Sequence, residues 1–127
     1  MINWITEEDA LVIHRMLIEI YGGPEGVRDF ALLQSSLAKS KNLYFYSEAP
    51  SLNELAASYI YGIVKNHPFV DGNKRVGFVV GESFLRMNGF QLEKDNDAAA
   101  NIILALAAGD IDEVGLVEFL DKHAHPI

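Results

Sequence analysis

The chain has 127 residues, half of them apolar, which is enough to bury a core, so we expect one domain over residues 1–127. Its formal net charge of −8 argues against partners that need a broad basic face, namely nucleic acids and anionic membranes. The sequence has no cysteine, no basic N-terminal region followed by an apolar run and no uninterrupted apolar stretch of about 18 residues, which excludes disulfides and thiol chemistry and predicts a cytoplasmic protein without a membrane span.

Three helices are predicted before residue 67, and two of them begin at a capping box. Thr6-Glu7-Glu8-Asp9 resembles such a box, and the apolar residues of Leu11–Ile20 follow it as a first helix. A short helix is expected from about Asp29 to Lys39. Ser51-Leu52-Asn53-Glu54 is the second capping box, and apolar residues then recur at helical spacing. This third helix delivers His67 at its end.

The nine residues that follow, His67–Arg75, read His-Pro-Phe-Val-Asp-Gly-Asn-Lys-Arg. Pro68 disfavours helical dihedral angles at the residue before it, and Asp71-Gly72 favours a turn. We therefore expect one helix to end near His67 and another to begin near Asn73. The new helix would point its unpaired N–H groups and the positive end of its dipole into the loop, an arrangement that binds phosphates.

The charged residues of this segment indicate phosphoryl or nucleotidyl transfer. Lys74 and Arg75 lie in the first helical turn, where each cation is disfavoured by roughly 0.3–1 kcal/mol and so calls for a negative partner such as phosphate. Asp71 would be repelled by phosphate unless a divalent cation lay between them, and Mg2+ is held by one or two carboxylates together with substrate phosphates. His67 carries an imidazole, which can take a proton from an attacking hydroxyl.

The helix predicted from about Asn73 to Asn88 is apolar around most of its circumference, which places it, buried, at the centre of a bundle. Gly77 and Gly81 lie four residues apart and would let neighbouring helices approach closely. Two further helices, about Asp97–Ala108 and Asp112–His123, complete an all-α fold of roughly six helices. No segment shows a convincing strand pattern.

The segment His67–Arg75 resembles the signature of the Fic/Doc family, whose common form is His-x-Phe-x-(Asp/Glu)-Gly-Asn-Gly-Arg. Lys74 replaces the last glycine, as in the Doc (death-on-curing) toxin branch. Further similarity to Doc proteins lies at His14, Tyr21–Asp29, Leu32-Leu33 and Asn88-Gly89. The resemblance covers most of the chain and implies the Fic/Doc fold, a compact all-α bundle around a central buried motif helix.

The resemblance also implies a role for each residue of the motif. His67 would be the catalytic base and Asp71 the protein ligand of Mg2+. The phosphates of ATP, the co-substrate, would be bound by Gly72, Asn73, Lys74 and Arg75, and the catalytic set would comprise His67, Asp71, Lys74 and Arg75. Phe69 would anchor the loop in the core.

The residue at position 74 decides between two reactions. Fic proteins with glycine there usually transfer AMP from ATP to a protein hydroxyl, whereas Doc, with lysine, phosphorylates a threonine of elongation factor Tu. Glycine lets a phosphate approach the backbone, whereas lysine adds bulk and a point charge at the same place. We therefore expect a toxin kinase that transfers the γ-phosphate of ATP to a Ser/Thr hydroxyl of a translation protein. AMP transfer and non-catalytic binding of an antitoxin or other partner are the alternatives.

The chain lacks the inhibitory segment Ser/Thr-x-x-x-Glu-Gly/Asn that many Fic proteins carry. Restraint of such an enzyme would then come from a separate protein. Resemblance to Doc implies an antitoxin whose disordered tail folds as a helix in a groove of the toxin. The expected partners are therefore an antitoxin and a target protein of the translation machinery, with no direct contact to nucleic acid or membrane.

Four features outside the motif each have two interpretations. His14 is expected to be a hydrogen-bonded structural residue rather than a ligand. The glycines of Gly22–Gly26 are expected to permit a tight turn rather than to bind an anion. Arg28 either contacts phosphate or a partner, or forms a helix-start salt bridge or remains solvated. Tyr44-Phe45-Tyr46, predicted to lie between two helices, is expected to cover the core, with a substrate-docking edge as the alternative.

Overall fold

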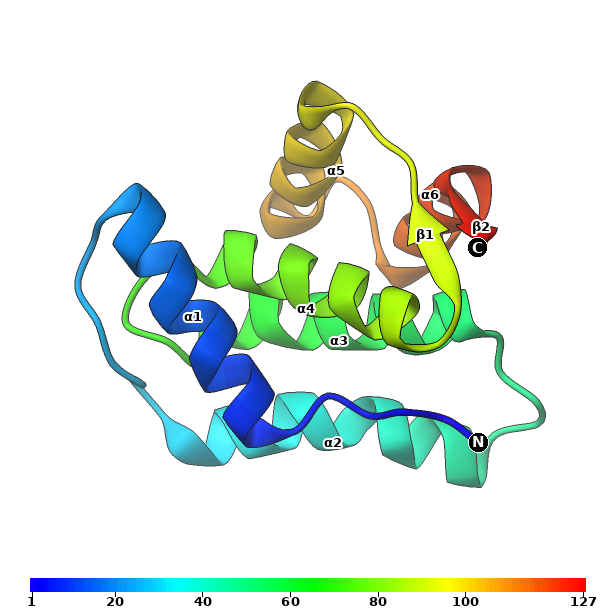
Figure 1. The fold of residues 1–127 in the computed structure, drawn as a ribbon, viewed down its shortest axis with the longest axis horizontal. Helices are drawn as coiled ribbons and strands as arrows, with labels where there is room; N and C mark the ends of the chain where they lie inside the picture. Colours follow the sequence, from blue (N-terminus) through cyan, green and yellow to red (C-terminus); the bar gives the residue numbers. More distant parts are fainter.

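The computed structural model describes all 127 residues and contains six α-helices and one two-stranded sheet (Figure 1). The helices are α1 (Glu7–Tyr21), α2 (Phe30–Tyr46), α3 (Leu52–Asn66), α4 (Asn73–Met87), α5 (Asn96–Ala108) and α6 (Glu113–His123). The strands β1 (Phe90–Leu92) and β2 (Ala124–Pro126) are antiparallel, with Phe90 opposite Pro126. The predicted helical bundle is confirmed. None of the helices combines the length and the apolar character that crossing a membrane requires.

Side chains fix where most of the helices begin. Thr6 and Ser51 form capping boxes with Asp9 and Glu54, as the sequence predicts. Three other helices begin at aspartates that accept a hydrogen bond from a backbone N–H in the first turn: Asp29, Asp95 and Asp112. The exception is α4, which begins at Gly72 without any side-chain cap. Its first N–H groups are therefore left for another acceptor.

Helices α3 and α4 lie side by side at the centre of the molecule (Figure 1). On its other side α3 is covered by α2, whereas α1 and α5 pack on α4. The prediction of a buried motif helix is confirmed for α4, which contributes eight buried residues, and α3 shares the centre with ten. Lys74 and Arg75 of α4 remain exposed. The motif helix is thus rigidly packed along its length while the first turn stays accessible.

Glycines set the distance between the two central helices. A Cβ atom at Gly77 would lie 2.9 Å from Cγ2 of Val64, and one at Gly81 would overlap the side chain of Ile60. The predicted close approach at Gly77 and Gly81 is therefore confirmed. Any larger residue there would push α4, and with it the motif, away from α3.

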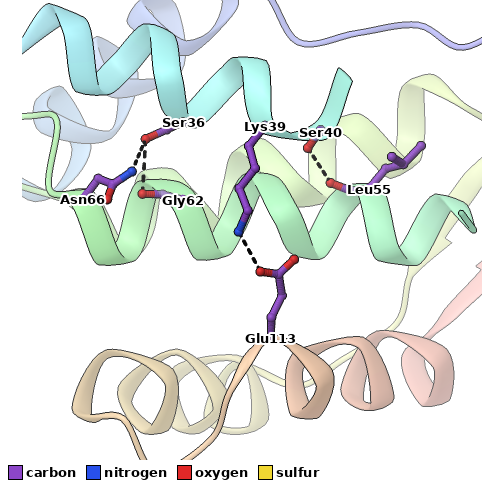
Figure 2. Close-up of polar contacts among 7 residues, drawn as sticks. All are labelled: Ser36, Lys39, Ser40, Leu55, Gly62, Asn66 and Glu113. Atoms are coloured by element: carbon purple, nitrogen blue, oxygen red, sulfur yellow. Dashed lines mark hydrogen bonds and ion pairs between the residues drawn. The ribbon is translucent and has the colours of Figure 1, made fainter. Parts of the chain in front are cut away.

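Small polar residues hold α2 against α3 (Figure 2). The hydroxyl of Ser36 lies 3.2 Å from the carbonyl oxygen of Gly62 and accepts a hydrogen bond of 3.0 Å from the amide of Asn66. One turn further along, Ser40 donates to the carbonyl of Leu55 at 2.8 Å. The Ser36 contacts hold the C-terminal end of α3, from which the motif loop departs, and the Ser40 contact holds the first turn of α3.

The second helix is longer than predicted, and this changes the position of the aromatic triplet. It continues to Tyr46 instead of ending near Lys39, because the intervening residues include neither glycine nor proline. Tyr44-Phe45-Tyr46 therefore lie in the last turn of α2 and not between two helices. Tyr44 packs edge-on against Trp4, but Phe45 and Tyr46 are 64% and 87% exposed, so only the first of the three helps to cover the core.

The N-terminal segment Met1–Ile5 packs against the end of α4 opposite the motif. The backbone N–H of Asn3 donates to Oδ1 of Asn88 at 2.8 Å, and Nδ2 of Asn88 donates back to the carbonyl of Asn3 at 2.9 Å. Ile5 is buried and donates its backbone N–H to the hydroxyl of Tyr59 at 3.1 Å. Burial raises the pKa of Tyr59 to about 12.

Candidate functional site

A cavity of about 900 Å3 opens between α1, α4 and α5. All the predicted site residues line it: His67, Asp71, Gly72, Asn73, Lys74 and Arg75. The remaining wall is apolar over much of its area, with Leu17 from α1, Phe78 from α4 and Ile103 from α5. Small-molecule sites typically measure about 300–1,000 Å3 and combine apolar walls with a few polar groups. The cavity is therefore large enough for a nucleotide.

His67 ends α3 in the left-handed conformation, with φ 49° and ψ 56°. This backbone is unfavourable for a residue with a side chain, by roughly 1–2 kcal/mol, and must be held by its surroundings. Pro68 follows directly and cannot continue the helix. The predicted helix end at His67 is confirmed, and its side chain is exposed at the cavity.

Asn73 closes the motif loop through its side chain. Its Oδ1 accepts from the backbone N–H of Phe69 at 2.9 Å, and its Nδ2 donates to the carbonyl of Phe69 at 3.0 Å. Both residues are buried, and Phe69 anchors the loop in the core as expected. The Asn73 side chain therefore positions the loop. A contact between Asn73 and phosphate stays a prediction, and the backbone N–H of Asn73 is the group that is free to make it.

His14 supports the loop from the side of α1. Its ring stacks on that of Phe69, with centroids 4.2 Å apart and an interplanar angle of 10°. Its Nε2 lies 3.0 Å from the carbonyl oxygen of Asp71, and because a carbonyl can only accept, this nitrogen carries the proton. The predicted structural role of His14 is confirmed, and the structure specifies it: His14 holds the backbone of Asp71.

The first turn of α4 concentrates positive charge and contains no acidic residue. The backbone N–H groups of residues 73–75 have no acceptor in the protein. Lys74 forms no ion pair, and the guanidinium carbon of Arg75 lies 4.2 Å from the ring centroid of Tyr21. Free N–H groups, the helix dipole and two cations together make this turn suited to an anion. Lys65, in the last turn of α3, does not line the cavity.

Asp71 brings a carboxylate to the same cavity, where it makes no ion pair. Gly23 has φ +114°, so its backbone conformation favours glycine, and a Cβ atom there would displace Oδ2 of Asp71, which lies 2.6 Å from that position. Gly22, Gly23 and Gly26 all have positive φ, but residues 22–29 form an extended connection from α1 to α2 (Figure 1), so the predicted tight turn is wrong. No group of three or more His, Asp or Glu side chains could hold a metal alone, so a cation at Asp71 would need phosphate oxygens as further ligands, which fits Mg2+.

The segment between α1 and α2 binds the motif loop through hydrogen bonds from Arg28. Its Nε donates to the carbonyl of His67 at 2.7 Å, and its Nη2 donates to the carbonyl of Asn66 at 2.8 Å. Its backbone N–H donates to the carbonyl of Pro68 at 2.7 Å. Arg28 forms no salt bridge and does not line the cavity. Neither interpretation from the sequence anticipated this binding to backbone carbonyls.

Four polar residues of the cavity wall were not predicted: Tyr21, Glu82, Lys94 and Asn96. Lys94 pairs with Glu82 at 3.1 Å from the connection between β1 and α5. These two residues lie on different elements, so no periodicity or spacing links them. Tyr21 could have been found, because it ends the first helix directly before Gly22-Gly23, within the segment that resembles Doc proteins.

A family model described as "Fic/DOC family" matches residues 4–85, which include α1 to α3, the motif loop and most of α4. The chain belongs to the Fic/DOC family. Two relatives place this Fic/DOC protein in the Doc branch. It is 32% identical over 115 residues to "Toxin Doc" of Mycolicibacterium smegmatis, covering 88% of this chain and 86% of that protein. It is 28% identical over 118 residues to "Protein kinase doc" of Escherichia phage P1, covering 93% of both chains.

Proposed function

We propose that this Fic/DOC protein is a toxin kinase of a toxin–antitoxin pair, which transfers the γ-phosphate of ATP to a Ser/Thr hydroxyl of a translation protein. The observation that carries the proposal is the uncapped, doubly cationic first turn of α4, which opens into one cavity with His67 and Asp71. The names of the two relatives, one a toxin and one a protein kinase, support the same activity.

In this proposal the first turn of α4 binds the phosphates. The free N–H groups of residues 73–75 and the side chains of Lys74 and Arg75 would contact phosphate oxygens. Gly72, whose φ is +81°, lets the backbone turn toward the anion. Mg2+, held by Asp71 and phosphate oxygens, would offset the repulsion between this carboxylate and the phosphates of ATP.

His67 would act as the general base. Its imidazole takes the proton of the target hydroxyl, and the hydroxyl oxygen attacks the γ-phosphorus. One P–O bond forms to the target while the bond from the γ-phosphorus to the bridging oxygen breaks, and ADP leaves with the negative charge. Lys74 and Arg75 stabilise that charge as it develops. Positioning and electrostatics carry most phosphoryl transfer, which is why a rigid helix suits the task.

AMP transfer is the second candidate, because the motif otherwise agrees with that of AMP-transferring Fic proteins. Lys74 and the protein-kinase relative favour phosphate transfer. A non-catalytic role in binding an antitoxin or other partner is the third, and the exposed His67 side chain at the cavity counts against it. We further propose that the protein acts in the cytoplasm and is restrained by an antitoxin whose disordered tail folds on its surface.

Labelled ATP distinguishes these functions. Purified protein is incubated with Mg2+ and either a bacterial translation extract or isolated elongation factor Tu, in parallel with ATP labelled at the γ- or the α-phosphate. We expect γ label on one protein band, lowered about 10²- to 10⁴-fold in His67→Ala. His125→Ala is the matched control, because His125 is exposed and lies outside the cavity wall. Transfer of α label would instead establish AMP transfer, and absence of both labels would favour the binding role.

A further inference from the structure

We infer that Arg28 is a positioning residue, which holds the backbone of His67 in its left-handed conformation and thereby directs the imidazole into the cavity. The inference deepens the proposed function and rests on the role of His67 as base. The two residues lie 39 positions apart in the chain and meet through the hydrogen bond from Arg28 Nε to the His67 carbonyl.

The conformation of His67 requires an external hold. It is one of two non-glycine residues in the chain with positive φ, the other being Ala49. A strained backbone persists only where its surroundings fix it, and such positions concentrate at functional sites. Without that hold the chain between Asn66 and Pro68 would relax to an extended form, which is the preferred form before proline. The imidazole would then leave its present place at the cavity.

Arg28 provides the hold through a forked contact. Its two nitrogens reach the carbonyls of Asn66 and His67 at 2.8 and 2.7 Å, and these belong to the carbonyls that a helix end leaves unpaired. A guanidinium at the C-terminus of α3 is also favoured by the helix dipole. The planar fork spans two carbonyls at once, a geometry that the single ammonium group of lysine does not reproduce.

Arg28 is itself fixed by the backbone around it. The N–H groups of Arg28 and Asp29 donate to the carbonyl of Pro68 at 2.7 and 3.1 Å, and Asp29 caps α2. On the far side of the loop, the N–H of Val70 donates to the carbonyl of Gly26 at 3.0 Å. The contact therefore transmits the rigidity of α2 to the one residue of the loop whose conformation is unfavourable.

Because Arg28 does not line the cavity, its effect should fall on turnover and not on ATP binding. We expect Arg28→Ala to lower kcat for γ-phosphate transfer at least about tenfold while the KM for ATP changes less than about twofold, since a small displacement of a reacting group is sufficient for such a loss. Arg28→Lys should remain impaired. Arg15→Ala is the control, because Arg15 is an exposed arginine of α1 that forms no ion pair.

A spectroscopic readout tests the inference independently of activity. The imidazole NMR signals of His67 should shift or broaden in Arg28→Ala and Arg28→Lys, whereas those of His14, His123 and His125 should not. Unchanged kcat together with unchanged His67 signals would overturn the inference. So would a change in all four histidines with a lower midpoint of thermal unfolding in both variants, because this would indicate a general structural role. If His67→Ala retained full transfer, the proposed role of His67 as general base would fail, and the NMR comparison would still decide whether Arg28 holds His67.

Discussion

Side chains around the motif loop fall into two groups with different consequences for substitution. His67, Asp71 and Lys74 are exposed at the cavity and contribute little to folding. His14 and Asn73 are buried and hold the loop through hydrogen bonds to its backbone. Loss of an exposed group should therefore affect chemistry alone, whereas loss of a buried one should affect chemistry through stability.

Asn73 and Lys74 are adjacent and allow this difference to be measured. Asn73→Ala leaves the buried N–H and carbonyl of Phe69 without partners, which should lower the free energy of unfolding by roughly 1–3 kcal/mol. Lys74→Ala should leave it unchanged or raise it by roughly 0.3–1 kcal/mol, because a cation in the first turn opposes the helix dipole. Urea unfolding of both variants checks this. Equal destabilisation by the two substitutions would contradict the division into two groups.

At the scale of elements, α4 differs from the other helices in how it begins. Five helices have a side-chain cap, and α4 instead offers bare N–H groups beside two cations. This end of the helix is less stable alone than with an anion. Anion binding should therefore stabilise the whole protein, since any ligand that binds only the folded state does so.

Inorganic phosphate provides the simplest probe of this end of α4. At about ten times its dissociation constant it should add about 1.4 kcal/mol of stability and raise the midpoint of thermal unfolding by several degrees. Chloride at equal ionic strength should raise it less. The double variant Lys74→Ala/Arg75→Ala should lose the difference between the two salts. A difference that persisted in the double variant would place the anion elsewhere.

Much of this arrangement is predictable from the sequence. The elements that were missed are those without a local signal in the chain. Capping boxes at Thr6 and Ser51 and the turn residues around His67 are local signals, and each correctly marks a helix end. The C-terminal end of α2 was predicted too early, near Lys39 instead of Tyr46. Residues 40–46 contain no glycine or proline, so no local signal marks where the helix ends. The strands were missed because three residues are too few for an alternating pattern to appear.

The site divides in the same way. The cavity-facing residues of the motif lie within one segment of nine residues, so the sequence alone indicates their chemistry. The contacts that hold them join positions far apart, since His14 and Asp71 are 57 positions apart and Arg28 and Asn66 are 38 positions apart. Such contacts depend on how α1 and α2 pack against the central helices. No spacing rule along the chain predicts them.

At the scale of the whole molecule, the N-terminal segment completes the core that α3 and α4 share. Trp4 stacks on Phe84 of α4, and Ile5 is buried beside Tyr59 of α3. Both chain ends lie at the C-terminal end of α4 (Figure 1), where Ile127 donates its N–H to the carbonyl of Gly89 at 2.8 Å. The motif occupies the opposite end of the same helix.

Tyr59 makes the stability of this closed core sensitive to alkaline pH. Its pKa is raised from 10.0 to about 12 by burial, so the folded state keeps the phenolic proton more tightly than the unfolded state. The associated stability is fully present below pH 10 and is lost as the pH rises toward 12. It amounts to about 2–3 kcal/mol, since one pKa unit corresponds to about 1.4 kcal/mol.

Unfolding measured between pH 9 and pH 12 in wild type and Tyr59→Phe isolates this effect from other groups that titrate there. Over this interval the free energy of unfolding of Tyr59→Phe should fall by about 2–3 kcal/mol less than that of wild type. Tyr44→Phe is the control, because Tyr44 is 40% exposed. Parallel curves for wild type and Tyr59→Phe would show that the Tyr59 proton is not linked to folding.

The contacts that hold the motif loop from outside also determine which mutations inactivate the protein. Nine codons encode the motif, yet His14, Gly23 and Arg28 lie outside them and each contacts the loop or leaves space for it. Spontaneous mutations that abolish the activity should therefore arise on both sides of the second helix. An intact motif in a sequenced genome is, for this protein, an insufficient sign that the product is still active.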